Sequence, residues 1–156
     1  MAKLLRKIKR GYWKKPDWLP AGEAPATAIT DLPNKESSLS FWRVNTPTEV
    51  DMAVLALAIN AANFDNLDIY EIDENIIQAA GIKIVDTPGE TAYSNANHLH
   101  VSLEELTTLS IDSLCKQMLT MGTITRHRES KLIERARVYK TDFDLSLLKE
   151  GILNKL

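Results

Sequence analysis

The sequence is poor in the residue types that define several specialised classes of protein. Its 156 residues include a single cysteine, Cys115, so no disulfide can form within the chain and a reducing compartment is the expected setting. Six glycines and six prolines are too few for a collagen-like or low-complexity chain. The most apolar stretch, 52–64, is too short to cross a bilayer, so the sequence predicts no transmembrane segment. The N-terminus has no apolar core of a secretory signal, and we expect a cytoplasmic protein.

The composition is otherwise that of a chain with enough apolar side chains to fill a core. Apolar residues make up 44% of the sequence and charged residues 26%, and a length near 150 predicts one domain over 1–156. The net charge of −2 conceals three blocks. Residues 1–15 carry seven basic and no acidic groups, residues 16–113 carry three basic and sixteen acidic groups, and residues 114–156 carry nine basic and five acidic groups. Such blocks influence association with partners rather than the fold.

The predicted secondary structure indicates an α+β fold or a small α/β fold. We expect four parts: a basic N-terminal arm at 1–15, a proline-rich connector at 16–38, an α/β core at 39–121 and C-terminal helices at 123–156. Runs of aromatic and β-branched residues predict strands at 39–44, 67–72 and 82–85. Helical periodicity predicts helices at 47–62, 74–80, 102–121, 123–141 and 145–154. The result is a three- to four-stranded sheet with packed helices and a helical C-terminal third.

Two of these helices have a sequence signal for their first turn. Thr46 and Glu49 have the spacing of a capping box, and Pro47 occupies the first helical position. Ser102 and Glu105 have the same spacing, so we expect the helix that ends near residue 121 to begin there.

The N-terminal arm contains the first set of candidate binding residues. Its cations are interleaved with two aromatic side chains, a combination suited to phosphate contacts with base stacking. The same segment could dock on an acidic partner, lie on an anionic membrane surface, or pack as a strand or helix against the acidic middle of its own chain. The candidate residues are Lys3, Arg6, Lys7, Lys9, Arg10, Tyr12, Trp13, Lys14 and Lys15.

A second basic stretch lies near the C-terminus. Arg128, Lys131 and Arg135 recur at the spacing of one stripe along a helix and add to the candidate binding residues. The stripe borders the apolar face, where long basic side chains commonly cover apolar surface with their stems. It therefore has both a binding interpretation and a structural one.

Three residues are weak candidates for a metal site. His98 and His100 would point to the same side of a strand, and Glu104 is a nearby carboxylate. Zinc sites need three or four ligands, and these spacings are not diagnostic, so a structural role is the alternative. The sequence has no glycine-rich phosphate loop or nucleophile elbow, and we expect no cofactor.

Several short motifs together resemble small bacterial proteins that have no assigned activity. The motifs are Trp18-x-Pro20, Leu39-Ser40-x-Trp42-x-Val44 and Thr87-Pro88-Gly89, and the resemblance extends over residues 6–120. It implies a bacterial accessory protein of the kind encoded in mobile-element or defence gene clusters. It implies no catalytic residues.

Three functional hypotheses follow from the sequence. The first is a non-enzymatic accessory subunit that binds another protein or a second copy of itself, because separate charge blocks favour oriented docking. The second is a nucleic-acid-binding accessory protein that uses residues 3–15 with help from residues 126–140. The third is a metal-dependent enzyme with a site around His98, His100 and Glu104.

Overall fold

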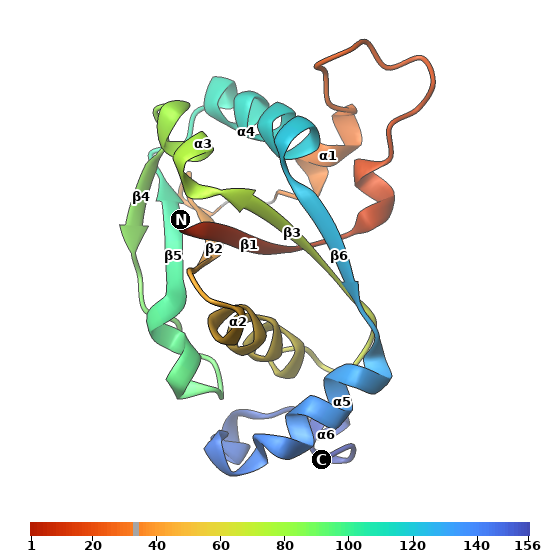
Figure 1. Ribbon diagram of the computed structural model, residues 1–156, viewed down its shortest axis with the longest axis vertical. Helices are drawn as coiled ribbons and strands as arrows, with labels where there is room; N and C mark the ends of the chain where they lie inside the picture. The colour runs from red at the N-terminus through yellow and green to blue at the C-terminus, as the bar shows by residue number, and fades with distance from the viewer. Residues whose placement is uncertain (33–34) are drawn as a thin grey trace.

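A computed structural model describes residues 1–32 and 35–156, and its centre is one antiparallel sheet of six strands (Figure 1). The strands are β1 (Lys3–Ile8), β2 (Leu39–Val44), β3 (Leu67–Asp73), β4 (Lys83–Asp86), β5 (His100–Glu104) and β6 (Thr123–His127). Their order across the sheet is β4-β5-β2-β1-β3-β6, so β1 is an interior strand and β4 and β6 form the two edges. The fold is therefore α+β, as the sequence predicts.

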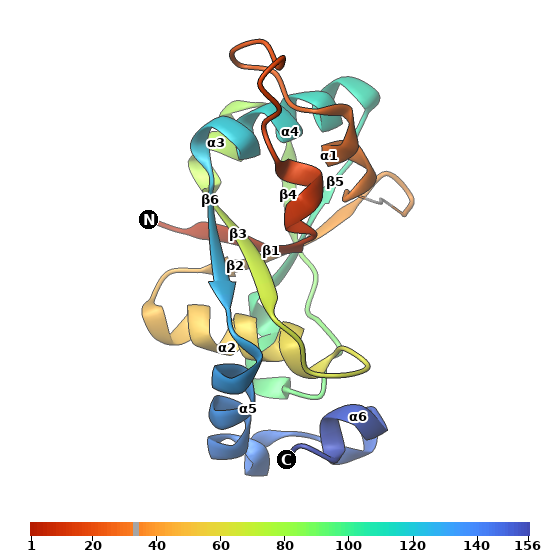
Figure 2. The ribbon, with the colours of Figure 1, turned by 90° about the vertical axis from the view of Figure 1, so that its right-hand side faces the viewer.

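Helices cover both faces of this sheet. The α4 layer consists of η1 (Arg10–Trp13), α1 (Ala26–Thr30), α3 (Glu74–Ala79) and α4 (Thr108–Met121). The α2 layer consists of α2 (Pro47–Ile59), η2 (Ser94–Leu99), α5 (Glu129–Val138), η3 (Lys140–Asp142), η4 (Leu145–Leu147) and α6 (Glu150–Leu153). Figures 1 and 2 show α1, α3 and α4 on one side of the sheet and α2, α5 and α6 on the other. No helix in the described part of the chain has the length and apolar content that a membrane span requires.

Strand β1 supplies side chains to a separate core on each face. Leu4 packs with the α4 layer and Leu5 with the α2 layer, and neither is exposed to solvent. This arrangement follows from the alternation of side chains along a strand. Because helices cover both faces of the sheet, β1 needs apolar residues in both directions, as a strand buried on two faces does.

The expected strand count of three to four is wrong, because the sheet has six strands. The predicted strands at 39–44, 67–72 and 82–85 correspond to β2, β3 and β4. Strands β5 and β6 were not predicted, whereas β1 confirms the alternative that the N-terminal segment packs as a strand; each of the three pairs with a strand far away in the sequence. Residues 3–8, expected to belong to an N-terminal arm, are thus placed in the sheet by long-range pairing.

The helix predictions were correct at the starts of α2 and α3 and wrong at residues 102 and 123, and the helix expected over 145–154 is divided into η4 and α6. Helix α2 begins with the predicted capping box, in which the Thr46 hydroxyl accepts from the amide of Glu49 at 3.2 Å and Glu49 accepts from the amide of Thr46. Ser102 instead lies in β5, and α4 begins with a capping box of Thr107 and Ser110. Residues 123–127, expected to be the first part of a helix over 123–141, form the edge strand β6. Helix α5 begins only after them, at Glu129. Pairing of β6 with β3 outweighs the helical spacing of its few apolar residues.

Candidate binding groove between β1 and β2

Strands β1 and β2 part from each other halfway along their length. They pair only from Lys3–Leu5 with Val44–Trp42, whereas β1 pairs with β3 along all six of its residues. Strand β2 keeps its pairing with β5 over residues 39–42. Residues 6–8 of β1 and 39–41 of β2 therefore face each other without pairing.

A cavity of about 310 Å³, here called the split groove, lies where the two strands separate. The end of α1 borders it on one side and α2 on the other. Its lining residues are Arg6, Lys7, Ile8, Lys9, Thr30, Asp31, Ser40, Trp42 and Leu57. A second cavity of about 420 Å³ shares Ser40, Trp42 and Leu57 with it and extends toward the 88–91 loop and His100. The split groove thus continues along the α2 side of β2.

Arg6 spans the opening between the strands. Its Nη1 atom donates to the carbonyl oxygen of Ser40 at 2.7 Å, and its guanidinium lies 5.6 Å from the centre of the Phe41 ring. Its Nε atom is the one buried side-chain nitrogen or oxygen without a hydrogen-bond partner among the described residues. Burial lowers the pKa of Arg6 and the charge of Asp31 opposes this, but a guanidinium keeps its charge at any ordinary pH.

Asp31 fixes the end of the split groove nearest η1. Its Oδ2 atom accepts from the backbone amide of Lys9 at 2.7 Å and from the indole Nε1 of Trp13 at 2.7 Å. Asp31 is only 8% exposed, and the Trp13 ring is buried against Tyr70 with the ring centres 5.1 Å apart. A buried carboxylate needs such donors. The contact therefore joins η1, α1 and the outer end of β1 into one unit.

The predicted N-terminal binding residues divide into two groups. Lys3 pairs with Glu71, Arg6 reaches across the split groove, and Trp13 is buried in the core. The expectation that Trp13 stacks on a base is therefore wrong, because its ring packs inside the molecule and its N–H is committed to Asp31. Tyr12 is partly exposed beneath the Lys9 ammonium, 5.7 Å from its ring centre. The second group, exposed and without an ion pair in the described structure, is Lys7, Lys9, Arg10, Lys14 and Lys15.

The second basic stretch lies elsewhere and is largely neutralised. Lys131 pairs with Glu134 at 2.8 Å, and Arg135 pairs with Asp51 of α2 at 2.8 Å. Arg128 is exposed at the N-cap of α5. Figure 2 shows α5 well away from η1, so the structure does not join the two stretches into one basic track.

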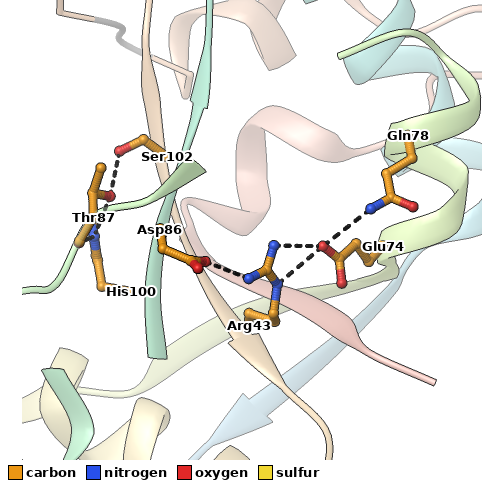
Figure 3. Close-up of polar contacts among 7 residues, drawn as sticks. All are labelled: Arg43, Glu74, Gln78, Asp86, Thr87, His100 and Ser102. Atoms are coloured by element: carbon orange, nitrogen blue, oxygen red, sulfur yellow. Dashed lines mark hydrogen bonds and ion pairs between the residues drawn. The ribbon is translucent and has the colours of Figure 1, made fainter. Parts of the chain in front are cut away.

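The three metal-site candidates do not converge. His98 is exposed in η2, whereas Glu104 lies opposite Lys83 at the far end of β5 from His100. The Nδ1 atom of His100 lies 2.5 Å from the carbonyl oxygen of Thr87 and 3.1 Å from its hydroxyl, as Figure 3 shows. Across the residues that the structure describes, no three His, Cys, Asp or Glu side chains form a group able to hold a metal.

A charged cluster that the sequence did not indicate lies on the α4 side of the sheet (Figure 3). Arg43 donates to Glu74 through Nε at 3.0 Å and Nη2 at 2.7 Å, and to Asp86 through Nη1 at 2.5 Å. These contacts join β2 to the start of α3 and the end of β4. All three guanidinium nitrogens of Arg43 donate hydrogen bonds within the chain, so the cluster stabilises the packing of these elements.

Sequence reasoning found the cations of the split groove but not the residues that shape it. Asp31, Ser40, Trp42 and Leu57 come from the connector, β2 and α2, and no local pattern connects them. The split groove exists because β1 pairs fully with β3 but only partly with β2. A single sequence contains no signal for this difference. In the comparisons with known proteins, no family model, curated protein or solved structure matches this chain.

Proposed function

We propose that the chain is a non-enzymatic accessory module that binds a partner protein through the split groove and its basic rim. The observation that carries the proposal is the separation of β1 from β2, which leaves a cavity with apolar walls and cations at its edge. Protein interfaces commonly combine an apolar centre with a polar, charged rim. The resemblance to small bacterial proteins supports a role as a subunit of a mobile-element or defence system.

The arrangement of the walls supports a protein partner. Ile8, Trp42 and Leu57 supply apolar surface between strand edges that do not pair with each other. An extended segment of another protein can use such edges for backbone hydrogen bonds and the pockets beside them for side chains. The cations Lys7 and Lys9 would then steer an acidic partner toward the split groove.

Nucleic acid is the second candidate, and one observation favours it. The five exposed cations between residues 7 and 15 have no acidic partner within the described residues, and a phosphate backbone would neutralise them. Against it, Trp13 is buried, which removes one stacking ring, and Lys131 and Arg135 are paired, which neutralises two of the three candidate cations in the second basic stretch.

Affinity purification of the tagged chain from its native host tests the proposal. The wild type is compared with the double variant Lys7→Gln, Lys9→Gln and with a control, Lys149→Gln, Lys155→Gln, which removes two exposed lysines far from the split groove. A protein retained in stoichiometric amount by the wild type and the control, but lost by the groove variant, is the expected result. Equal retention by all three proteins would contradict it. Absorbance at 260 nm that falls after nuclease treatment would favour nucleic acid.

A further inference from the structure

In the described part of the chain, three arginines extend from the strands of the sheet, and Arg6 differs from the other two because it makes no ion pair. Arg126 of β6 uses Nε and Nη2 to hold both carboxylate oxygens of Asp68, at 2.9 and 2.8 Å. Arg43 of β2 is held by Glu74 and Asp86. Arg6 makes one side-chain hydrogen bond, to a neutral carbonyl through Nη1. Its Nε–Nη2 edge, the one that Arg126 presents to a carboxylate, has no acceptor in the described part of the chain.

The position of Arg6 is fixed by contacts that leave this edge unused. Nη1 is anchored on the Ser40 carbonyl, and the plane of the guanidinium is supported by the Phe41 ring. The Nε hydrogen is buried beside the split groove and unsatisfied, which is rare in folded proteins and unfavourable for a charged donor. The Nε–Nη2 edge of a planar guanidinium has two parallel N–H donors, which match the two oxygens of a carboxylate.

We infer that the split groove receives an acidic side chain from an extended, partly apolar segment of the partner protein, with the Nε–Nη2 edge of Arg6 as the carboxylate receptor. This inference rests on the proposed function and specifies the chemistry of the partner segment that binds in the split groove. Because Nε is buried in the unbound protein, the inference requires the Arg6 side chain to turn about its Nη1 anchor when the carboxylate binds.

The charges around the split groove favour an anionic side chain. Arg6, Lys7 and Lys9 line it together with one acid, Asp31. The Oδ2 atom of Asp31 already accepts two hydrogen bonds from its own chain, so its charge is partly compensated. The cavity therefore has an excess of positive charge at the point where the strands separate.

The apolar walls favour a protein segment over a phosphate backbone. Trp42 and Leu57 flank the cations, and an acidic residue between apolar neighbours would contact both kinds of surface. A nucleic acid presents a row of phosphates with no apolar side chains between them, so it would leave the surface of Trp42 and Leu57 without a matching contact.

Fluorescence anisotropy with the full-length protein tests this inference. The probe is a labelled peptide of alternating glutamate and leucine, and its controls are the same peptide with glutamine in place of glutamate and a single-stranded oligo-dT. Arg6→Lys keeps the charge but removes the bidentate edge, and Lys149→Gln is the matched surface control. We expect the glutamate peptide to bind, Arg6→Lys to weaken it at least about 10-fold, and Lys149→Gln to change it less than about 2-fold.

Each other outcome has a distinct meaning. Equal binding of the glutamine peptide, or binding unchanged in Arg6→Lys, would overturn the carboxylate receptor. The proposed function would survive that result if the native partner were still lost by the Lys7→Gln, Lys9→Gln variant. Tighter, Arg6-dependent binding of oligo-dT would replace the acidic protein segment with nucleic acid.

A second measurement covers the case in which Arg6→Lys does not fold. In the wild-type protein, the Nε–H signal of each arginine is followed by nuclear magnetic resonance during addition of the glutamate peptide. The expected result is a shift of one arginine signal that the glutamine peptide does not produce, with the signals of Arg43 and Arg126 unchanged. Absence of any such shift at saturating peptide would contradict the inference.

Discussion

Replacement of Asp31 by alanine should destabilise the protein more than replacement of any exposed aspartate. The carboxylate joins η1 to the end of α1 through two hydrogen bonds of 2.7 Å, one from the Lys9 amide and one from the Trp13 indole. Alanine leaves both donors without an acceptor. Trp13 is 3% exposed, so its N–H cannot reach water without movement of the ring.

The magnitude follows from the burial of the two donors. A buried donor that loses its acceptor costs about 1–3 kcal/mol, and the part-buried Lys9 amide should lie at the low end of that range. We therefore expect Asp31→Ala to lower the free energy of unfolding by about 2–4 kcal/mol. That is a large part of the 5–15 kcal/mol or so that stabilises an ordinary domain.

Urea unfolding followed by circular dichroism measures this change. Asp17→Ala is the matched control, because Asp17 is exposed and makes no side-chain hydrogen bond in the described structure. Trp13→Phe removes the indole donor and keeps an aromatic ring, so the double variant with Asp31→Ala should be less destabilised than the sum of the two changes by at least about 1 kcal/mol. Additive effects, or a loss below about 0.5 kcal/mol for Asp31→Ala, would refute the reasoning.

Three further predictions concern the core, a helix start and pH. Burial, together with the charge of Asp112, raises the pKa of the Cys115 thiol to about 11, so a thiol reagent should label the native protein at least about 100-fold more slowly than the protein in denaturant at pH 8. Thr46→Ala removes the hydroxyl that caps α2 and should lower the free energy of unfolding by about 1 kcal/mol in the same urea assay, with Thr48→Ala as control. The hydrogen bond from Arg126 lowers the pKa of Asp68, so the carboxylate stabilises the fold above its unfolded pKa, and this contribution is lost as the pH falls through the lower folded value. The difference in unfolding free energy between wild type and Asp68→Asn should therefore be constant near neutral pH and shrink as the pH falls below the ordinary pKa of an aspartate, whereas a constant difference at all pH values would contradict the reasoning.

Local signals were sufficient for part of the fold. The capping box at Thr46, the apolar helix after it and the three strands β2, β3 and β4 each have a complete pattern within a short window of sequence. The strands that sequence reasoning missed depend on distant partners. Residues 123–127 alternate weakly and lie beside helical spacing, and they form a strand because all five of them pair with β3.

The candidate site shows the same division. The excess of cations in residues 3–15 is visible in the sequence, but their division into paired, buried and exposed groups is not. Trp13 illustrates the difficulty, because an aromatic residue among lysines has the composition of a stacking surface and the environment of a core residue. Its partner Asp31 is eighteen residues away across an irregular segment, which no local pattern connects.

The interior position of β1 also affects the order in which the sheet can assemble during synthesis. During synthesis β1 is made before either of its neighbours, and its pairing with β3 requires residues 67–73. Before then only β2, at residues 39–44, can pair with it, and that pairing covers half of β1; the last strand of the sheet, β6, follows at residues 123–127. Contacts between such distant segments slow folding. Removal of residues 1–15 would leave β4-β5-β2 and β3-β6 without the strand that joins them, so a truncated chain would report on assembly of the sheet rather than on the loss of a binding arm.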